Sequence, residues 1–353
     1  MNHDHSAQLQ EQIKDAISNR QAVAICGGGS KAFLARKVEG LPLSTRQHSG
    51  VIKYEPGELI LTARSGTPLK EIQQLLAAQG QMLAFEPPLF DDQATLGGTI
   101  ACGLSGPRRP YAGAARDFVL GTKIINGKAE VLHFGGEVMK NVAGYDVSRL
   151  MTGAYGTLGL LLEVSLKIMP APEQETTRVF DCSASDAIQR INALSSQPLP
   201  ISAACHIDGK LYLRLSGITS NVKACSSTTG GETLANADTF WQQLRDQQLP
   251  LFSNQQNLWR LSVPPTTAPL TLPGKSIIDW GGGLRWLSSD EAIESVRNAT
   301  SNAGGHATLF RNHDGIGDIF HPLPPAIKAL HKNLKTAFDP HGVLNPGRMY
   351  QDI

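Results

Sequence analysis

Apolar runs of strand length alternate with helical spacing over the first 170 residues of the chain. A small apolar strand is expected at 22–26, followed by a glycine turn and an irregular or helical crossover. Another strand is expected at 58–64. Thr67 as N-cap and Pro68 at the first helical position then predict a helix that runs up to Gly80. Further buried strands, each beside a glycine cluster, are expected at 118–125 and 158–168. The pattern therefore indicates an α/β unit.

A second unit is predicted to begin at 169–172, where two prolines remove backbone donors and stop both helices and strand ladders. From 176 to 310 strands alternate with helices, which favours an α+β layer over a parallel wound sheet. The expected strands are 202–207, 211–215, 258–263 and 280–287, and the expected helices are 185–194, 239–245 and 290–303. The Ser/Thr/Gly-rich segment 225–231 is expected to be a surface loop. A tail helix at 325–338 leads into a turn at 339–342.

The composition is that of a folded protein of about two domains. The chain has 353 residues, of which 41% are hydrophobic and 18% charged, so general disorder is excluded. Its 32 Lys and Arg residues against 31 Asp and Glu leave no excess positive charge for a nucleic acid. The N-terminus lacks the pattern of a secretory signal, and the most apolar stretch, 158–164, is too short to span a membrane. We therefore expect a cytoplasmic protein; if it sits at the inner face of the cytoplasmic membrane, a partner must hold it there.

Five cysteines are present: Cys26, Cys102, Cys182, Cys205 and Cys225. Their number is odd, their spacing is wide and none forms a CxxC pair, so neither a disulfide framework nor a zinc or iron–sulfur ligand set is expected. No metal site is predicted, and a reducing compartment fits best.

Glycine is concentrated in three clusters of the first unit. The first, 27–31, follows a strand, so its backbone N–H groups could cradle a phosphate with Lys31 adding charge; a flexible turn is an equally good interpretation of this cluster alone. It contains neither a Walker motif nor the GxGxxG fingerprint. The second, 94–110, combines small residues with hydroxyls, and the third is 153–159. Three such clusters favour one long ligand, which suits a dinucleotide.

Six motifs in order carry a family resemblance: 27–31, 86–88, 94–98, 141–146, 156–159 and 345–347. Together they resemble the FAD-binding flavoproteins of the vanillyl-alcohol oxidase and p-cresol methylhydroxylase (PCMH) type. Within that family, stretches such as 106–124, 278–287 and 344–350 look like the FAD-binding E-type subunits of bacterial glycolate oxidases, over nearly the whole chain.

The resemblance implies an α+β fold: a two-subdomain PCMH-type FAD-binding domain at 1–170, a smaller α+β cap domain at 171–322, and a helix and tail at 323–353 that return to the FAD domain. It places the pyrophosphate at the loop 27–32, Thr95, Gly97 and Gly98, the adenine near Gly159 and Leu160, and Asn345 near the flavin. The first loop lacks histidine, so non-covalent FAD is expected, with Cys102 the one candidate for a covalent link. The full set of expected FAD-binding residues is Gly27, Gly28, Gly29, Ser30, Lys31, Ala32, Pro87, Thr95, Gly97, Gly98, Gly103, Gly156, Thr157, Gly159, Leu160 and Asn345.

A catalytic constellation cannot be read from the chain. Relatives that oxidise 2-hydroxy acids carry GDGNxHP and EHG segments, and neither occurs here. His306 and His313 are the base candidates, although a single histidine in a strand-like run is more often structural. Arg108, Arg109 and Arg285 could clamp a carboxylate or serve as surface or interface cations. Trp280 and Trp286 are expected to pack the second unit, with a bulge or turn at 281–283.

The resemblance implies an FAD-dependent oxidoreductase subunit of a multi-subunit glycolate oxidase, which converts glycolate, a small 2-hydroxy acid, to glyoxylate. The expected partners are a D-type flavoprotein subunit and an F-type iron–sulfur subunit, because this chain lacks cluster cysteines of its own. The alternative is a non-catalytic electron-relay or assembly subunit that binds FAD, and the missing histidine motifs favour it for the local chemistry. A self-contained NAD(P)H reductase gains no support from a pyridine-nucleotide motif.

Overall fold

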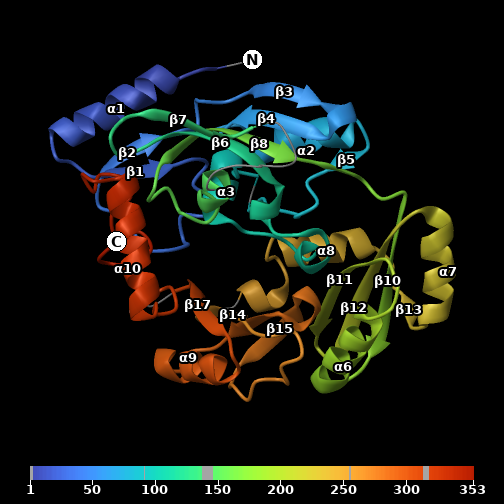
Figure 1. The fold of residues 1–353 in the computed structure, drawn as a ribbon. Helices are drawn as coiled ribbons and strands as arrows, with labels where there is room; N and C mark the ends of the chain where they lie inside the picture. The colour runs from blue at the N-terminus through green and yellow to red at the C-terminus, as the bar shows by residue number, and fades with distance from the viewer. Residues whose placement is uncertain (1–2, 91, 137–145, 254–255, 313–317) are drawn as a thin grey trace. The chain divides into compact units, whose positions relative to one another are not determined.

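A computed structural model describes residues 3–90, 92–136, 146–253, 256–312 and 318–353 (Figure 1). The chain divides into two compact units, each with its own sheets and core. Unit 1 comprises Met1–Ser105, Ala114–Pro170 and Pro322–Ile353, and unit 2 comprises Gly106–Gly113 and Ala171–His321. Unit 1 is thus assembled from three separate stretches of sequence.

Unit 1 is built on a five-stranded antiparallel sheet in the order β3-β4-β8-β6-β7. Its central strands are almost continuously apolar because both of their faces are covered, and β4 is buried at every position. The strands are β3 (Val51–Glu55), β4 (Ile60–Arg64), β6 (Val119–Ile125), β7 (Val131–Gly135) and β8 (Leu160–Lys167). Helices α2 (Leu69–Ala77), α3 (Leu96–Cys102) and α5 (Val147–Leu150) contribute to its larger core, and β5 (Gln81–Met82) pairs with β9 (Met169–Pro170).

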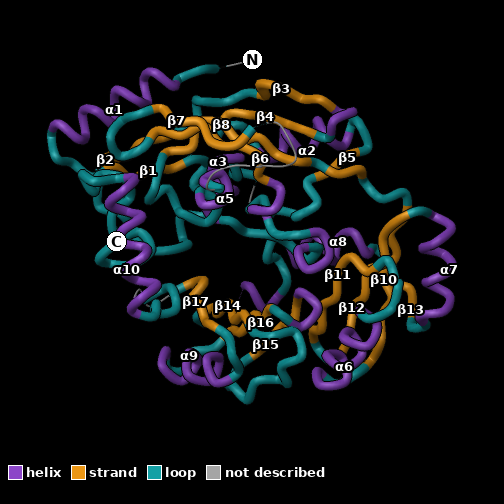
Figure 2. The backbone as a smooth tube through the Cα atoms, viewed as in Figure 1, coloured by secondary structure: helices purple, strands orange, loops and turns teal. Residues whose placement is uncertain are grey.

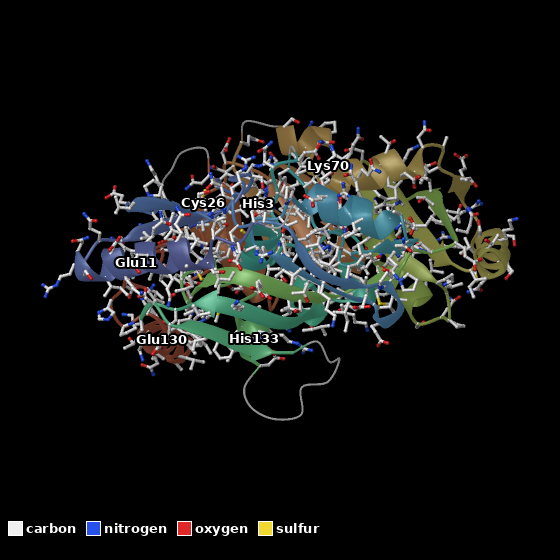
Figure 3. The ribbon with its side chains drawn as sticks, turned by 90° about the horizontal axis from the view of Figure 1, so that it is seen from above. His3, Glu11, Cys26, Lys70, Glu130 and His133 are labelled. Carbon is white, nitrogen blue, oxygen red and sulfur yellow. The ribbon has the colours of Figure 1, made fainter. Side chains whose placement is uncertain are left out.

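A second layer of unit 1 forms around the parallel pair β1 (Val23–Cys26) and β2 (Leu41–Ser44). Helix α1 (Ser6–Ser18) buries Leu9, Ile13 and Ala16 against this pair, while polar residues such as Glu11 lie on its exposed face (Figure 3). Helix α10 (Pro325–Phe338) and the tail after it also belong to unit 1, and Leu344 forms a parallel bridge to Val23. The C-terminal tail therefore lies directly beside β1.

Unit 2 contains one eight-stranded sheet in the order β13-β10-β12-β11-β15-β16-β14-β17, with all described neighbours antiparallel (Figure 2). Its strands are β10 (Gln174–Asp181), β11 (Ile201–Ile207), β12 (Lys210–Gly217), β13 (Glu232–Thr233), β14 (Leu258–Ser262), β15 (Lys275–Asp279), β16 (Leu284–Ser288) and β17 (His306–Arg311). Its helices are α4 (Arg109–Ala112), α6 (Ala184–Ser195), α7 (Thr219–Thr229), α8 (Ala237–Arg245) and α9 (Ile293–Asn302). Two apolar clusters, one around Leu213 and one around Trp259, form its core.

The prediction of a mixed α and β fold is confirmed, and three local expectations are corrected. Helix α2 begins at Leu69 with Pro68 as its N-cap, because the Thr67 hydroxyl instead accepts the N–H of Gly50 at 2.9 Å. The segment expected as a loop at 225–231 is helical as far as Thr229, and its hydroxyls hydrogen-bond to carbonyls three or four residues earlier. The strand expected at 280–287 is a hairpin: Trp280 and Gly281 have positive φ and separate β15 from β16.

The short segment Gly106–Gly113 groups with unit 2, whereas the sequence analysis places it within 1–170. Two contacts hold it there. The Trp280 indole N–H donates to the carbonyl of Gly106 at 3.0 Å, and Arg108 forms an ion pair with Glu175. Across the described residues, no helix combines the length and apolar character that a bilayer span requires.

Candidate functional site

A cavity of about 300 Å³ lies in unit 1, where the three glycine clusters meet the C-terminal tail. Its walls come from β1, the loop at 27–32, the α3 region, the loop at 155–159 and the tail. The lining residues are Ala24, Ile25, Cys26, Gly27, Gly28, Gly29, Ser30, Lys31, Ala32, Lys37, Val38, Thr45, Ser65, Thr95, Gly97, Gly98, Ala101, Cys102, Tyr155, Gly156, Gly159, Leu161, Asn345 and Arg348.

The loop at 27–32 packs so closely on the second glycine cluster that side chains are excluded between them. A Cβ atom on Gly28 would lie 1.5 Å from the carbonyl oxygen of Gln93, and one on Gly27 would lie 2.3 Å from Thr95 Oγ1. Gly29 adopts φ +77°, in the left-handed region that favours glycine. These glycines bring two stretches of backbone together to form one wall of the cavity.

Thr95 organises the adjacent wall. Its hydroxyl caps α3 by accepting the N–H of Gly98 at 3.3 Å. Gly97 lies against Ser65, where its own Cβ would meet the Ser65 Cβ at 2.6 Å. By contrast, a Cβ on Gly98 would have only Thr95 Oγ1, at 3.2 Å, within 4 Å. Gly98 also lines the cavity, so this part of the wall is formed by backbone without a side chain.

Ser65 supplies an unsatisfied hydrogen-bonding group at this wall. It is 1% exposed, it lines the cavity, and its hydroxyl has no hydrogen-bond partner among the described residues. Buried hydroxyls are normally hydrogen-bonded, so an orphan at a cavity wall fits a ligand rich in oxygen acceptors. Ser65 was not among the residues predicted from the sequence.

Positive charge reaches the cavity from three segments. Lys31 is buried, with its ammonium 3.4 Å from Ser30 Oγ and 5.4 Å from the centre of the Phe90 ring. Lys37 is exposed at the rim. Arg348 comes from the tail and donates to the carbonyl of Arg36 at 2.6 Å, and burial lowers the pKa of Arg348. None of the described lining residues is acidic, so this charge distribution fits an anionic diphosphate.

Asn345, in the C-terminal tail, connects the tail to β1 and to the loop at 155–159. Its side-chain oxygen accepts the N–H of Ile25 at 2.7 Å, and its amide nitrogen donates to the carbonyl of Tyr155 at 2.6 Å. Gly156, at φ +72°, lies against the same side chain: a Cβ there would be 2.8 Å from Asn345 Nδ2. One buried amide therefore connects β1, the third glycine cluster and the tail.

Most of the residues expected to bind FAD line this cavity: Gly27, Gly28, Gly29, Ser30, Lys31, Ala32, Thr95, Gly97, Gly98, Gly156, Gly159 and Asn345. Four do not line it, namely Pro87, Gly103, Thr157 and Leu160. Gly103 ends α3 at φ +64°, Thr157 donates its hydroxyl to the carbonyl of Ala154, and Leu160 is fully buried at the start of β8. The role of each residue toward FAD stays a prediction.

The two cysteines of the cavity differ in environment. Cys26 ends β1 and is exposed (Figure 3). Cys102, the candidate for a covalent link, lines the cavity, and burial raises the pKa of its thiol. A raised pKa keeps the sulfur protonated near neutral pH, which makes it a weak nucleophile.

Two of the arginines proposed for catalysis have structural partners inside unit 2. Arg108 pairs with Glu175; burial raises the pKa of this carboxyl, but Arg214 and Arg108 outweigh that effect and hold the pKa below its ordinary value. Arg285 donates to the carbonyls of Gly282 and Thr267, and burial lowers its pKa to about 10.

Of the histidine candidates and the tryptophan pair, the structure describes His306, Trp280 and Trp286. His306 is exposed at the start of β17, and His313 lies outside the described residues, as does most of the motif at 141–146. Arg109 and Arg260 approach the ring of Trp280, at 4.3 and 4.9 Å from its centre. Trp286 packs edge-on against Phe252 and Phe310 in unit 2.

Comparison with known proteins identifies the family. Residues 3–135 match the FAD binding domain family. Over 350 residues the chain is 49% identical to glycolate oxidase subunit GlcE of Escherichia coli K12, and the match covers 99% of both chains. The chain belongs to the GlcE family. The resemblance drawn from the glycine motifs is therefore confirmed, as are FAD as the cofactor and the class, an FAD-linked oxidoreductase subunit.

One solved structure and one further relative extend this result. The GlcE-family chain superimposes on p-cresol methylhydroxylase with a TM-score of 0.72 at 14% identity, covering 98% of this chain and 87% of the other, which confirms the PCMH-type fold. It is also 30% identical over 139 residues to glycolate oxidase subunit GlcD of Bacillus subtilis; that match covers 39% of this chain and 29% of GlcD.

Proposed function

We propose that this chain is the FAD-binding subunit of a glycolate oxidase complex that oxidises glycolate to glyoxylate. The observation that carries the proposal is the end-to-end match to GlcE, together with a cavity of suitable charge in the segment that matches FAD-binding domains. FAD, when bound, supplies the acceptor for the two electrons that an α-hydroxy acid loses on becoming a 2-oxo acid.

The residues of the cavity have distinct roles in this proposal. Lys31, Lys37 and Arg348 neutralise the diphosphate, and Ser65 donates its unsatisfied hydroxyl to an oxygen of the cofactor. The glycines of the first two clusters keep the walls free of side chains, and Asn345 holds three segments of wall at a fixed spacing. Together these residues bind the cofactor and orient it.

A second candidate function is an electron relay without substrate chemistry of its own. None of the described residues that line the cavity is a histidine or a carboxylate, the usual general bases. In this proposal a D-type flavoprotein subunit dehydrogenates the substrate, and an F-type iron–sulfur subunit takes the electrons onward. The widely spaced cysteines of this chain support assigning the cluster to a partner.

Anaerobic reduction by glycolate tests both proposals. The isolated chain, loaded with FAD, is mixed with glycolate and its flavin absorbance is followed; the assembled complex is the control. We expect the complex to bleach and the isolated chain to stay oxidised. Bleaching of the isolated chain would overturn the relay function. An assembled complex that keeps full activity without this chain would overturn the subunit function.

A further inference from the structure

The C-terminal tail contributes Asn345 and Arg348 to the cavity wall, and it follows a turn at 339–342. Helix α10 ends at Phe338, and the chain then turns to run beside β1. The N–H of Val23 donates to the carbonyl of Val343 at 2.8 Å, and the N–H of Asn345 donates to the carbonyl of Val23 at 3.1 Å. These two hydrogen bonds set the register that brings Asn345 and Arg348 to the cavity.

Lys335, in the last turn of α10, is a buried ammonium with three acceptors. Its side chain is 10% exposed. The Nζ atom donates to Asp339 Oδ2 at 2.7 Å, to the carbonyl of Thr157 at 2.9 Å and to the carbonyl of Leu344 at 2.6 Å. An ammonium has three donors, so these contacts satisfy it fully. One charge therefore connects α10, the third glycine cluster and the tail.

Asp339 completes the same arrangement from the other side. Its side chain is fully buried, and besides Lys335 it accepts the N–H of Val343 at 3.1 Å and that of Leu344 at 2.8 Å. Gly127 leaves room for it, since a Cβ there would lie 2.1 Å from Asp339 Oδ1. The carboxylate shapes the turn, and Lys335 anchors the turn to the loop at 155–159.

We infer that Lys335 and Asp339 are positioning residues for FAD. Neither residue lines the cavity, but together they hold the loop at 155–159 and the C-terminal tail, which both contribute lining residues. The inference rests on the FAD-binding function of the cavity. Removing one member of a buried ion pair leaves the other charge uncompensated, which costs far more than losing an exposed pair. The tail contributes no strand to the five-stranded sheet of unit 1, so it can detach locally while that sheet persists.

Lys335→Met tests this directly, with Lys332→Met as the matched control. Lys332 lies on the same helix and also pairs with a tail residue, Asp352, at 2.8 Å, but its side chain is 49% exposed. We expect Lys335→Met to weaken FAD binding at least about tenfold in a titration of the apoprotein, and Lys332→Met to stay within about twofold. The thermal shift that FAD produces separates positioning from general destabilisation. A structural role lowers the melting temperatures of the apo and FAD-bound forms equally, whereas a positioning role shrinks the difference between them.

A measurement on the unmodified chain covers the case in which the variant fails to fold. If docking of the tail and binding of FAD are coupled, bound FAD must stabilise the docked tail by the same free energy with which the docked tail stabilises FAD binding. Limited proteolysis after residue 338 should therefore be slower in the FAD-bound protein than in the apoprotein. Equal cleavage rates, or a Lys335→Met protein that binds FAD as tightly as the unmodified chain, would overturn the inference. Failure of the unmodified chain to bind FAD at all would instead overturn the proposed function.

Discussion

Replacing Gly98 with alanine should change stability and cofactor affinity in opposite directions. Gly98 lies inside α3, where alanine is favoured over glycine by up to about 1 kcal/mol. The new methyl group would meet only Thr95 Oγ1, at 3.2 Å, which a small shift relieves. We therefore expect the apoprotein to gain about 0.5 kcal/mol, or one to two degrees in melting temperature.

FAD binding should respond in the other direction because Gly98 lines the cavity, where an added methyl group takes up space at the wall. Adding a methyl group to a closely packed contact typically costs about 1–3 kcal/mol, which corresponds to an affinity roughly 5- to 150-fold weaker. Gly57→Ala is the control, since a Cβ on Gly57 would have no neighbouring atom of a described residue within 4 Å and Gly57 does not line the cavity. Calorimetry of the apoproteins and FAD titration measure the two effects. Unchanged affinity in Gly98→Ala would show that FAD does not approach α3 at this position, and a destabilised apoprotein would refute the steric argument.

Three further outcomes follow from the geometry. Ser65→Ala should weaken FAD binding about tenfold or more in titration, because it removes a donor to a charged ligand. Thr99→Val deletes a buried hydroxyl that also has no hydrogen-bond partner in the described part of the chain but lies outside the cavity, so it should leave FAD affinity unchanged. Equal effects of the two variants would contradict the assignment of Ser65 as a donor to FAD. Burial lowers the pKa of His48, and its Nδ1 accepts the N–H of His5, so the folded state binds fewer protons than the unfolded state. In urea unfolding, the stability should therefore be full above about pH 6.5 and should fall below that pH. His48→Gln should reduce that fall. His306→Ala should retain at least about a tenth of the glycolate-dependent dye reduction of the assembled complex, since loss of a general base typically costs about 100-fold or more; a loss that large with FAD still bound would place a substrate site in this chain.

The elements that could be predicted are those whose signals are local. Helix α10 is found at 325–338 as expected, because a proline at its start and an Asp-Pro pair after its end fix both limits within a few residues. The loop predicted at 225–231 was wrong for the converse reason, because α7 continues to Thr229. Serine and threonine side chains are typical of loops, yet here they hydrogen-bond back along the helix and Val222 buries one side of it.

The residues of the cavity also divide into those that the sequence could show and those that it could not. Its glycine clusters carry a pattern that sequence can show, whereas Ser65 is a single serine after a strand, and its importance depends on Gly97 packing on it from more than 30 residues away. Arg348 follows the motif at 345–347 and could have been found by extending it by one residue. Arg108 could not have been excluded as a carboxylate clamp, because its partner Glu175 lies on a strand of unit 2, 67 residues later.

The position of the tail has a consequence for how the protein is made. A ribosome releases residues 3–135, the part that matches FAD-binding domains, long before it reaches Asn345 and Arg348. The nascent chain can fold its five-stranded sheet only once β8 has emerged, and it can close the cavity only after all of unit 2 has been synthesised. Cofactor loading thus depends on synthesis through Arg348: a chain that stops before α10 keeps every glycine of the first two clusters but lacks one wall and one of the cations. Such fragments should accumulate as colourless protein, and the chain should acquire its flavin only after residue 348 has been synthesised.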